Sequence, residues 1–310
     1  MKVGRRTLEV SNRDKVFFPD AGITKGDLVD YYHRAAGLLL PHVRDRPVAM
    51  HRFPDGIDGQ GFYHKDVPDH FPGWIRNERV EKADGHLRQL VIDDAATLVY
   101  IANQGCITPH VWLSRVDRPD HPDRMVFDLD PPGEGARATF DAVRWTARRL
   151  RELLEELGLV PYVMTSGSKG LHLHVPLDRE ADFDDVRAFA MDAADLLVAR
   201  HPGRLTREQR KAKRGDRIYL DVMRNAYAQT TVAPYAVRAR TGAPVATPLS
   251  WDEIGRADLH PRRYGIANLF RRMAQKQDPW EGMGRHARGL EAPARDLKRL
   301  GQDAGSLARS

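Results

Sequence analysis

The first third of the chain combines one helical pattern with several short apolar runs. From about residue 24 to residue 39, apolar residues recur every three or four positions, and Thr24 precedes them as a suitable N-cap. This pattern predicts an amphipathic helix. Short apolar runs bounded by turn residues predict strands, and a second helical pattern follows them. The strands are expected at 6–10, 47–53, 61–64 and 90–92, and the second helix at 94–103.

The middle of the chain shows a longer order of elements. An alternating pattern predicts a strand at 125–130, and the Pro- and Gly-rich stretch at 131–135 ends it. The elements that follow are a helix, two paired strands, a helix and a last strand, expected at 138–157, 162–165, 171–175, 184–201 and 218–222. This order is that of a split βαβ unit, a sheet with helices on one face.

The composition is that of a globular protein without a membrane span. Of its 310 residues, 41% are hydrophobic and 30% are charged. No apolar run approaches the ~20 residues that cross a bilayer, and the N-terminus lacks the apolar core of a secretory signal. Cys106 is the single cysteine, which excludes an internal disulfide and any cysteine-built zinc site. We therefore expect a protein of the reducing cytoplasm.

Positive charge is concentrated in one segment. The formal net charge is +6, which by itself is only a weak indication of an anionic partner. Between residues 201 and 224, basic residues far outnumber Glu208, Asp216 and Asp221. The basic residues are Arg204, Arg207, Arg210, Lys211, Lys213, Arg214, Arg217 and Arg224. This segment fits a solvated Arg-rich loop as well as a phosphate-contacting surface.

Two aspartates lie two residues apart in the strand expected at 125–130. Because side chains alternate along a strand, Asp128 and Asp130 point to one face, and Phe127 and Leu129 point to the other. Two such carboxylates repel each other unless a cation lies between them, and Mg²⁺ or Mn²⁺ suits oxygen ligands of this kind. An exposed strand end without a ligand is the alternative.

A third carboxylate, Asp221, lies between Leu220 and Val222 in another apolar strand. An isolated charge in such surroundings costs several kcal/mol unless it is paired or bound to a metal. A salt bridge to Arg217 or Arg224 would satisfy Asp221, and so would a metal site shared with the other two aspartates. The sequence leaves both possibilities open.

A glycine-serine loop, TSGSKG at 165–170, joins the two paired strands. Its glycines allow a close turn with exposed N–H groups, and Ser166 and Lys169 add donors for phosphate. The spacing of a Walker A loop is absent, and a hairpin without a ligand is the alternative. His172 on the following strand could reach the same phosphates, whereas His174 is better explained as a packed histidine.

Two arginines alternate in the segment YAVRAR at 235–240, which predicts that Arg238 and Arg240 point to one face. Paired guanidinium groups can bind phosphate oxygens in a bidentate manner. Surface charge on an edge strand is the alternative. His110 carries no information by itself.

Seven motifs occur in a fixed order over about residues 5–255. They are SNRDKVFFP, ITKGDLVDYY, HVWLSR, VFDLDPPGEG, TSGSKGLHLHVPL, YLDVMRN and TTVAPYAVRARTGAPVATPLSW. As an ordered set, they resemble the polymerase domain of bacterial ligase D, a member of the archaeo-eukaryotic primase superfamily. The resemblance implies an α/β (α+β) fold of the primase type, with an RRM-like catalytic sheet covered by helices and an additional N-terminal α/β portion.

The same resemblance implies three portions along one compact polymerase unit. The N-terminal α/β portion at 1–115 would contact a DNA 5′-phosphate, and the primase-like catalytic portion would span 116–285. A basic tail at 286–310 would follow, with the pattern of a frayed helix.

The resemblance also implies roles for single residues. Asp128, Asp130 and Asp221 would be catalytic and would hold two metal ions, Mn²⁺ or Mg²⁺. Nucleotide-binding positions would be Arg52, His110, Ser166, Lys169, His172, Arg238 and Arg240. DNA-binding positions would be Lys15 and Lys25, for the downstream 5′-phosphate, and Phe62 and Tyr63, for stacking on a base. The chain departs from the family at His64, where a Gln is common.

The implied activity is template-directed nucleotidyl transfer that extends primers and fills gaps at DNA ends in non-homologous end joining, with a preference for ribonucleotides. The implied partners are gapped or end DNA with a 5′-phosphate, NTP or dNTP, Ku and a separate DNA ligase, in a cytoplasmic, nucleoid-associated setting without a membrane. No nuclease or ligase domain is recognisable, so we expect a stand-alone or split relative. Two alternatives are a metal-dependent nuclease that uses the same acids and a non-catalytic module that binds 5′-phosphate DNA ends.

Overall fold

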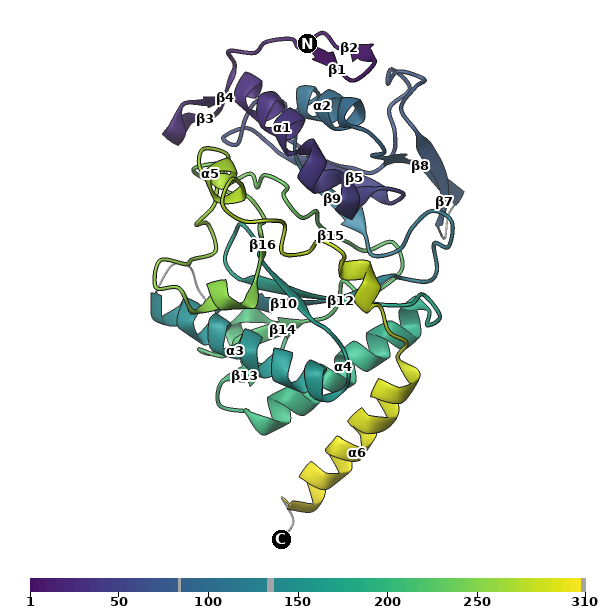
Figure 1. Ribbon diagram of the computed structural model, residues 1–310, viewed down its shortest axis with the longest axis vertical. Coiled ribbons are helices and arrows are strands. Elements are labelled where there is room, and N and C mark those ends of the chain that lie inside the picture. Colours follow the sequence, from purple (N-terminus) through teal and green to yellow (C-terminus); the bar gives the residue numbers. More distant parts are fainter. Residues whose placement is uncertain (83–84, 133–136, 308–310) are drawn as a thin grey trace. The chain divides into compact units, whose positions relative to one another are not determined.

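The computed structural model describes residues 1–82, 85–132 and 137–307, so the break expected at 131–135 lies partly outside the described residues. The chain forms two units, coloured along the sequence in Figure 1. Unit 1 comprises Met1–Asp117, Thr230–Thr247 and Arg262–Asp278, and unit 2 comprises Arg118–Gln229, Pro248–Pro261 and Pro279–Ser310. The portion expected at 116–285 therefore contributes to both units, because the chain returns to unit 1 twice after residue 229.

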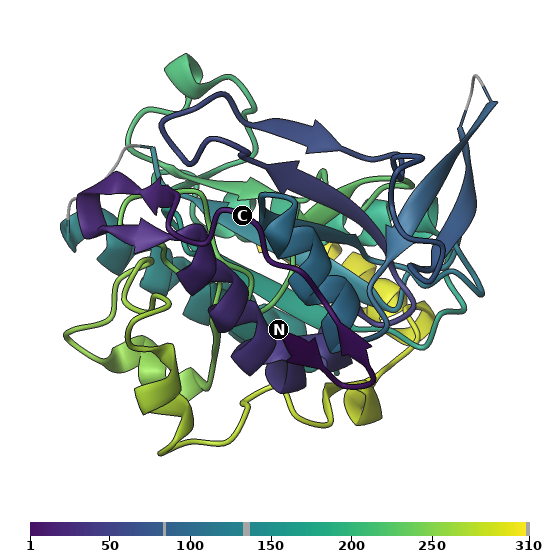
Figure 2. The same cartoon turned by 90° about the horizontal axis from the view of Figure 1, so that it is seen from above.

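The first helix of unit 1, α1 (Lys25–Val43), begins where the sequence pattern predicts it. The Thr24 hydroxyl accepts a hydrogen bond from the Asp27 N–H at 3.2 Å, and the Asp27 carboxylate accepts one from the Thr24 N–H at 2.8 Å. This capping box satisfies two backbone donors at the helix start. The helix continues past the expected end near residue 39. The second predicted helix is α2 (Ala95–Asn103), which lies beside α1 (Figure 2).

The main sheet of unit 1 has the strand order β15-β9-β5-β8-β7, and β6 pairs with β5. Its strands are β5 (Pro47–Arg52), β6 (Phe62–His64), β7 (Asn77–Lys82), β8 (Gly85–Val91), β9 (Cys106–Trp112) and β15 (Thr230–Val232). The pairings are antiparallel. Strand β9 was not predicted because it is buried along its whole length, so it shows no alternation, and it contains Pro109.

The other elements of unit 1 are short. They are β1 (Lys2–Val3), β2 (Arg6–Thr7), β3 (Val16–Phe18), η1 (Pro19–Ala21), β4 (Ile23–Thr24) and α5 (Leu269–Met273). Strands β1 and β2 form one hairpin, and β3 and β4 form another. The strand expected at 6–10 therefore covers only two residues, because β1 offers a short partner.

The sheet of unit 2 has the strand order β13-β14-β10-β12-β11-β16. Its strands are β10 (Arg124–Asp130), β11 (Tyr162–Thr165), β12 (Leu171–Pro176), β13 (Leu205–Thr206), β14 (Ile218–Asp221) and β16 (Pro248–Leu249). Strand β13 runs parallel to β14, and the other pairs are antiparallel. The four inner strands, in the order β14-β10-β12-β11, form the predicted split βαβ arrangement.

Two long helices cover one face of this sheet, α3 (Arg137–Glu156) and α4 (Phe183–Arg200) (Figure 1). On β10, the side chains of Met125, Phe127 and Leu129 are fully buried. Strand alternation directs the intervening residues, among them Asp128 and Asp130, to the opposite face. Asp128 and Asp130 thus lie on the face of the sheet that these helices do not cover.

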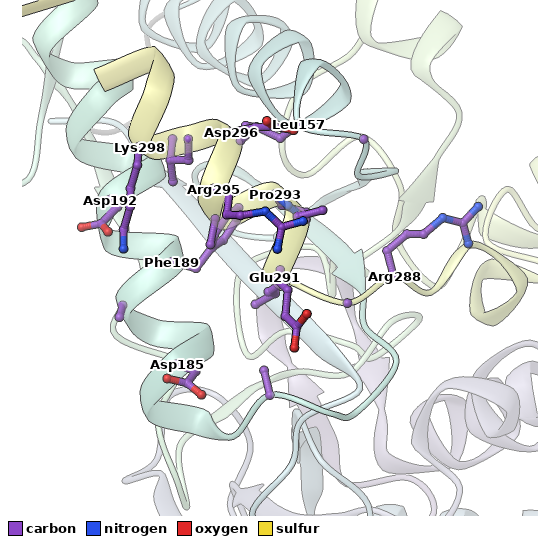
Figure 3. Close-up of a pocket in the computed structure, with 18 of the residues that line it drawn as sticks. Leu157, Asp185, Phe189, Asp192, Arg288, Glu291, Pro293, Arg295, Asp296 and Lys298 are labelled. Atoms are coloured by element: carbon purple, nitrogen blue, oxygen red, sulfur yellow. The ribbon is translucent and has the colours of Figure 1, made fainter. Parts of the chain in front are cut away.

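The tail that was expected to be a frayed helix forms α6 (Glu291–Leu307), which packs along α4. Leu297 of α6 is buried, and a cleft of about 1110 Å³ lies between the two helices (Figure 3). Three short helical turns complete the chain: η2 (Lys211–Lys213), η3 (Trp251–Gly255) and η4 (Met283–His286). No helix in the described ranges has both the length and the apolar character that a bilayer crossing requires.

The segment around Arg238 and Arg240 is not a strand, so strand alternation, from which a shared face was predicted for the two side chains, does not apply there. The Arg238 N–H donates to the Pro244 carbonyl at 2.7 Å, and the Arg240 N–H donates to the Arg238 carbonyl at 2.8 Å. Val237 forms only an isolated bridge with Val245. The segment is therefore a series of turns held by local hydrogen bonds.

Candidate active site

Three aspartates share the polar face of the unit 2 sheet. Asp221 on β14 is directly opposite Asp128 on β10, and Asp130 follows two residues later on β10. Directly opposed residues point to the same face with Cβ atoms about 4.5–5.5 Å apart, and residues two apart on one strand share a face as well. The structure therefore brings Asp221 to the two other carboxylates, from which it is distant along the chain.

His172 lies beside this acidic group. It is opposite Asp128 on β12, and its Nε2 is 3.3 Å from Asp128 Oδ1. Burial and the negative charges of Asp128 and Asp221 raise the pKa of Asp130 to about 6, although His172 opposes this effect. His174, expected to be packed, is fully buried and stacks on His172 with ring centroids 6.2 Å apart. The crowding of negative charge favours a cation at this face.

Asn225 fixes the register that brings Asp221 opposite Asp128. Its side-chain amide donates to the Val126 carbonyl at 2.7 Å and accepts from the Val126 N–H at 2.8 Å. It also donates to the Val222 carbonyl at 2.9 Å and is fully buried. The side chain thus continues the pairing of β10 beyond the end of β14. The sequence analysis quoted this residue only within a motif.

The predicted glycine-serine loop is a hairpin between β11 and β12. Ser166 Oγ accepts hydrogen bonds from the Ser168 and Gly170 N–H groups at 3.2 and 3.1 Å, so this hydroxyl is used inside the turn. A Cβ atom at Gly170 would lie 2.0 Å from the Leu129 carbonyl oxygen, so only glycine fits there. This close approach places the hairpin, with half-buried Lys169, next to the end of β10.

The acidic group has the donor chemistry of a divalent-cation site. Mg²⁺ and Mn²⁺ prefer carboxylate oxygens, and the pKa of Asp130 is raised first by burial and then by negative charge that a cation would offset. Within the described ranges, no group of three or more His, Cys, Asp or Glu side chains has the spacing to hold a metal ion. The fit therefore rests on the donor types and their shared face, and not on a preformed cage.

His51, Tyr63 and His110 form an aromatic group on the unit 1 sheet. The rings of His51 and Tyr63 stack with centroids 4.2 Å apart, and the His110 centroid is 6.1 Å from His51 and 5.3 Å from Tyr63. The register explains this group, because Tyr63 is opposite His51 and His110 is opposite Ala49. Tyr63 and Phe62, the two predicted stacking residues, are 53% and 44% exposed.

Arg52 points away from this aromatic group. The pairing of β5 with β9 is irregular between His51 and Arg52, but the pairing with β6 is regular. His51 stacks on Tyr63, whereas the Arg52 guanidinium lies 5.6 Å from the ring centroid of Phe62, so the two side chains lie on opposite faces. Arg52 Nε donates to the Gln104 carbonyl at 2.9 Å, and its Nη1 is 3.0 Å from His64 Nδ1. The structure therefore does not bring Arg52 and His110 together, and His64, the residue that departs from the family pattern, holds the Arg52 side chain.

Arg238 and Arg240 act on the charge of His51. Burial, followed by the positive charges of these two arginines, lowers the pKa of His51 to about 4. The aromatic group therefore lies in a positive field that favours an anion. Sequence patterns give no signal for His51, because its neighbours come from other segments of the chain.

Lys15 and Lys25 flank the β3–β4 hairpin, and the Lys25 N–H donates to the Lys15 carbonyl at 2.8 Å. Lys15 Nζ is 2.5 Å from Asp55 Oδ1, whereas Lys25 Nζ is buried and donates to the Ser11 carbonyl at 2.7 Å. Burial and the charge of Lys15 lower the pKa of Lys25. The structure thus brings together the two lysines predicted to bind a phosphate.

Several arginines of the basic segment 204–217 support the fold. Arg207, Arg214 and Arg217 donate hydrogen bonds to backbone carbonyls at 2.7–2.9 Å. The Arg204 guanidinium lies 4.7 Å from the centroid of the Trp145 ring. The segment therefore presents a smaller positive surface than its composition suggests.

Comparisons with known proteins agree with one another. A family model described as LigD, primase-polymerase domain, matches residues 24–280. The chain is 34% identical over 277 residues to the multifunctional non-homologous end joining protein LigD of Mycobacterium bovis, covering 87% of this chain and 36% of that protein. It is 30% identical over 274 residues to the bifunctional LigD of Bacillus subtilis, covering 88% and 43%. The chain thus spans less than half the length of these relatives.

A solved structure shows the same fold. The polymerase domain of Mycobacterium tuberculosis ligase D, in complex with DNA, matches with a TM-score of 0.85 and 34% identity, over 91% of this chain and 100% of that chain. That domain has the archaeo-eukaryotic primase fold, so the predicted fold class is confirmed. Because the family model matches most of the length of this chain, the chain belongs to the family of LigD primase-polymerase domains.

Proposed function

We propose that the protein is a template-directed nucleotidyltransferase that extends primers and fills gaps at DNA ends in non-homologous end joining. The observation that carries this proposal is the register of β10, which has Asp221 opposite Asp128 on one side and His172 opposite Asp128 on the other. Nucleotidyl transfer needs an activated hydroxyl and neutralisation of a triphosphate, and an acidic face beside a phosphate-type hairpin suits both needs.

The acidic face is the proposed catalytic centre. Two divalent cations, Mg²⁺ or Mn²⁺, held by Asp128, Asp130 and Asp221, would activate the primer 3′-hydroxyl and stabilise the leaving pyrophosphate. His172, within reach of the Asp128 carboxylate, keeps that side chain oriented. Lys169 supplies positive charge for the phosphates, and Ser166 shapes the hairpin from inside through its two accepted hydrogen bonds.

Unit 1 carries the other proposed ligands of nucleotide and DNA. Arg238 and Arg240 can bind triphosphate oxygens in a bidentate manner, in the same positive field that lowers the pKa of His51. His110 lies beside the exposed ring of Tyr63, which offers a stacking surface for a base. Phe62 offers a second exposed ring on the opposite face of β6, beside Arg52.

The DNA substrate of the proposal is a gapped or broken end with a downstream 5′-phosphate. Lys15 and Lys25 are the proposed ligands of that phosphate, since both flank the β3–β4 hairpin and Lys15 is close enough for its charge to lower, together with burial, the pKa of Lys25. The names of the relatives state a role in non-homologous end joining, and we extend that role to this chain. The proposal also includes a preference for ribonucleotides, and Ku and a separate ligase as partners.

The test is primer extension on a gapped duplex that carries a 5′-phosphate. Each nucleotide is supplied singly, as NTP or dNTP, with Mg²⁺ or Mn²⁺. We expect the primer to gain the nucleotide that is complementary to the template. Shortening of DNA without any triphosphate would instead indicate a nuclease. Binding that responds to the 5′-phosphate, with no change in primer length under either metal, would indicate a non-catalytic end-binding module.

A further inference from the structure

A partly buried chain of hydrogen bonds holds the segment that leads to Arg238 and Arg240. The Tyr235 hydroxyl donates to Asp278 Oδ1 at 2.7 Å, and Asp278 Oδ2 is 3.0 Å from His42 Nε2. Tyr235 is fully buried, and its backbone has a φ of +64°, in the left-handed region that bulky residues rarely adopt. Such a conformation persists only where the surrounding structure holds it.

Two tyrosines of α1 hold the backbone around this strained residue. The Tyr31 hydroxyl donates to the Tyr235 carbonyl at 2.8 Å. The Tyr32 hydroxyl accepts from the Val237 N–H at 3.0 Å and donates to the Ile107 carbonyl at 2.6 Å. Burial raises the pKa of both phenols, so they remain protonated donors at neutral pH. Residues 235–237 are thus held through both side chains and backbone.

The hydrogen bonds that fix this segment extend to the residue directly before Arg238. The Val237 carbonyl accepts from Thr108 Oγ1 at 2.6 Å, and the next residue is Arg238, whose N–H donates to the Pro244 carbonyl. These hydrogen bonds fix the backbone just before Arg238. The direction in which the Arg238 side chain starts therefore depends on the residues that hold this backbone. Arg240 follows within the same series of turns, since its N–H donates to the Arg238 carbonyl.

We propose that Tyr235, Asp278 and His42 are positioning residues for nucleotide binding: they fix the left-handed turn at Tyr235 and thereby the direction in which Arg238 and Arg240 meet a triphosphate. The inference rests on the proposed function, in which the two arginines bind that triphosphate. The carboxylate of Asp278 is suited to this role because it is satisfied from two sides, by a phenol and by an imidazole.

The first test removes single contacts. Tyr235→Phe deletes one hydroxyl and keeps the ring, and we expect the nucleotide KM to rise roughly two- to tenfold, the range for one lost hydrogen bond. We expect kcat and DNA affinity to stay unchanged. Asp278→Ala removes both contacts and raises KM further, whereas Asp278→Asn, which keeps the shape and an acceptor for Tyr235, restores most of the affinity. Thermal unfolding identifies any variant that fails to fold.

A matched control removes a phenol elsewhere. Tyr162→Phe deletes the hydroxyl that lies 2.5 Å from His286 Nδ1 in unit 2, and we expect no change in nucleotide KM. The comparison separates the loss of any tyrosine hydroxyl from the loss of this one.

A second readout does not depend on activity. The pKa of His51 is lowered to about 4 partly by Arg238 and Arg240, so NMR titration of His51 reports where these charges lie. The other neighbours of His51, namely Phe53, Tyr63 and His110, are unchanged in the variants. Burial, the larger cause of the low pKa, is the same in the variants, so we expect the pKa of His51 to rise only in part in Tyr235→Phe and to stay unchanged in Tyr162→Phe.

The outcomes separate this inference from the proposed function. An unchanged KM in folded Tyr235→Phe and Asp278→Ala overturns the positioning role, whether or not the His51 pKa moves. The double variant Arg238→Ala with Arg240→Ala tests the ligands themselves. If KM rises there and not in Tyr235→Phe, only the positioning role fails. If the double variant also keeps the KM of the natural protein, the assignment of the two arginines as triphosphate ligands fails.

Discussion

At the residue scale, His51 shows how burial and two nearby arginines change the pKa of one side chain. Its pKa is about 4 in the folded protein against an ordinary value of 6.5, first through burial and then through Arg238 and Arg240. Between these two pH values, the folded protein binds fewer protons than the unfolded chain. The contribution of His51 to stability is therefore fully present above about pH 6.5 and is lost as the pH falls toward 4.

This sign gives a prediction for a single substitution. We expect His51→Gln to reduce the rise in the free energy of unfolding between pH 4 and pH 6.5, measured by denaturant unfolding at several pH values. The natural protein, measured in the same buffers, is the reference. An equally steep rise in the variant would mean that His51 is not held in its neutral form by its surroundings.

Single-residue patterns predicted part of the candidate site. The shared face of Asp128 and Asp130 follows from strand alternation alone, so it was predictable. The position of Asp221 opposite Asp128 was not, because alternation says nothing about which strands are neighbours. His51 was missed for the same reason, since its stacking partner Tyr63 comes from another strand.

At the element scale, a side chain continues the pairing of β10 where the neighbouring strand β14 ends. Asn225 pairs with both backbone groups of Val126, directly beyond the last paired residues of the two strands. Removal of this amide leaves a buried N–H and a buried carbonyl without their partner. The position of Asp221 relative to Asp128 then loses its support.

Asn225→Ala is therefore expected to lower both stability and activity. We expect the free energy of unfolding to fall by roughly 2–4 kcal/mol, because the N–H and the carbonyl of Val126 lose their partner and the hydrogen bond to the Val222 carbonyl is lost as well. Primer extension should fall more steeply than DNA binding. The control is Asn77→Ala, which removes one longer hydrogen bond, 3.4 Å, to the Ile75 carbonyl. Equal losses of stability in the two variants would contradict this role of Asn225.

The elements that sequence patterns predicted are those stabilised by local signals. Helix α1 has its cap at Thr24, and α4 has an apolar stripe and an N-cap at Asp182. Strand β9 was missed because tertiary burial on both faces removes its alternation. The tail forms the ordered helix α6 because Leu297 finds a partner surface on α4, which its polar composition does not predict.

At the scale of the whole molecule, contiguous portions of sequence differ from the units of the fold. The expected divisions, near residues 115 and 285, separate contiguous portions of the chain. The two units instead exchange segments, with Thr230–Thr247 and Arg262–Asp278 returning to unit 1. These returns bring Arg238, Arg240 and Asp278 into the same unit as His51, a result that local sequence patterns cannot supply.

At this scale, the proposed phosphate site predicts a preference for DNA with a 5′-phosphate. We expect Lys15→Gln to reduce the preference for 5′-phosphorylated over unphosphorylated gapped DNA about tenfold, the loss expected for one charged contact. The nucleotide KM should not change. The comparison is fluorescence anisotropy on the two DNAs, with Arg13→Gln, a nearby exposed cation paired with Asp30, as control. A preference as strong as that of the natural protein would exclude Lys15 from the phosphate site.

The central claim is that the acidic face of unit 2 performs nucleotidyl transfer. It is tested most directly by primer extension on a gapped duplex with the natural protein and with the double variant Asp128→Asn, Asp130→Asn, alongside DNA affinity measured by anisotropy. We predict template-directed extension by the natural protein and its complete loss in the variant, with DNA affinity retained. Extension by the variant at the rate of the natural protein would contradict the account.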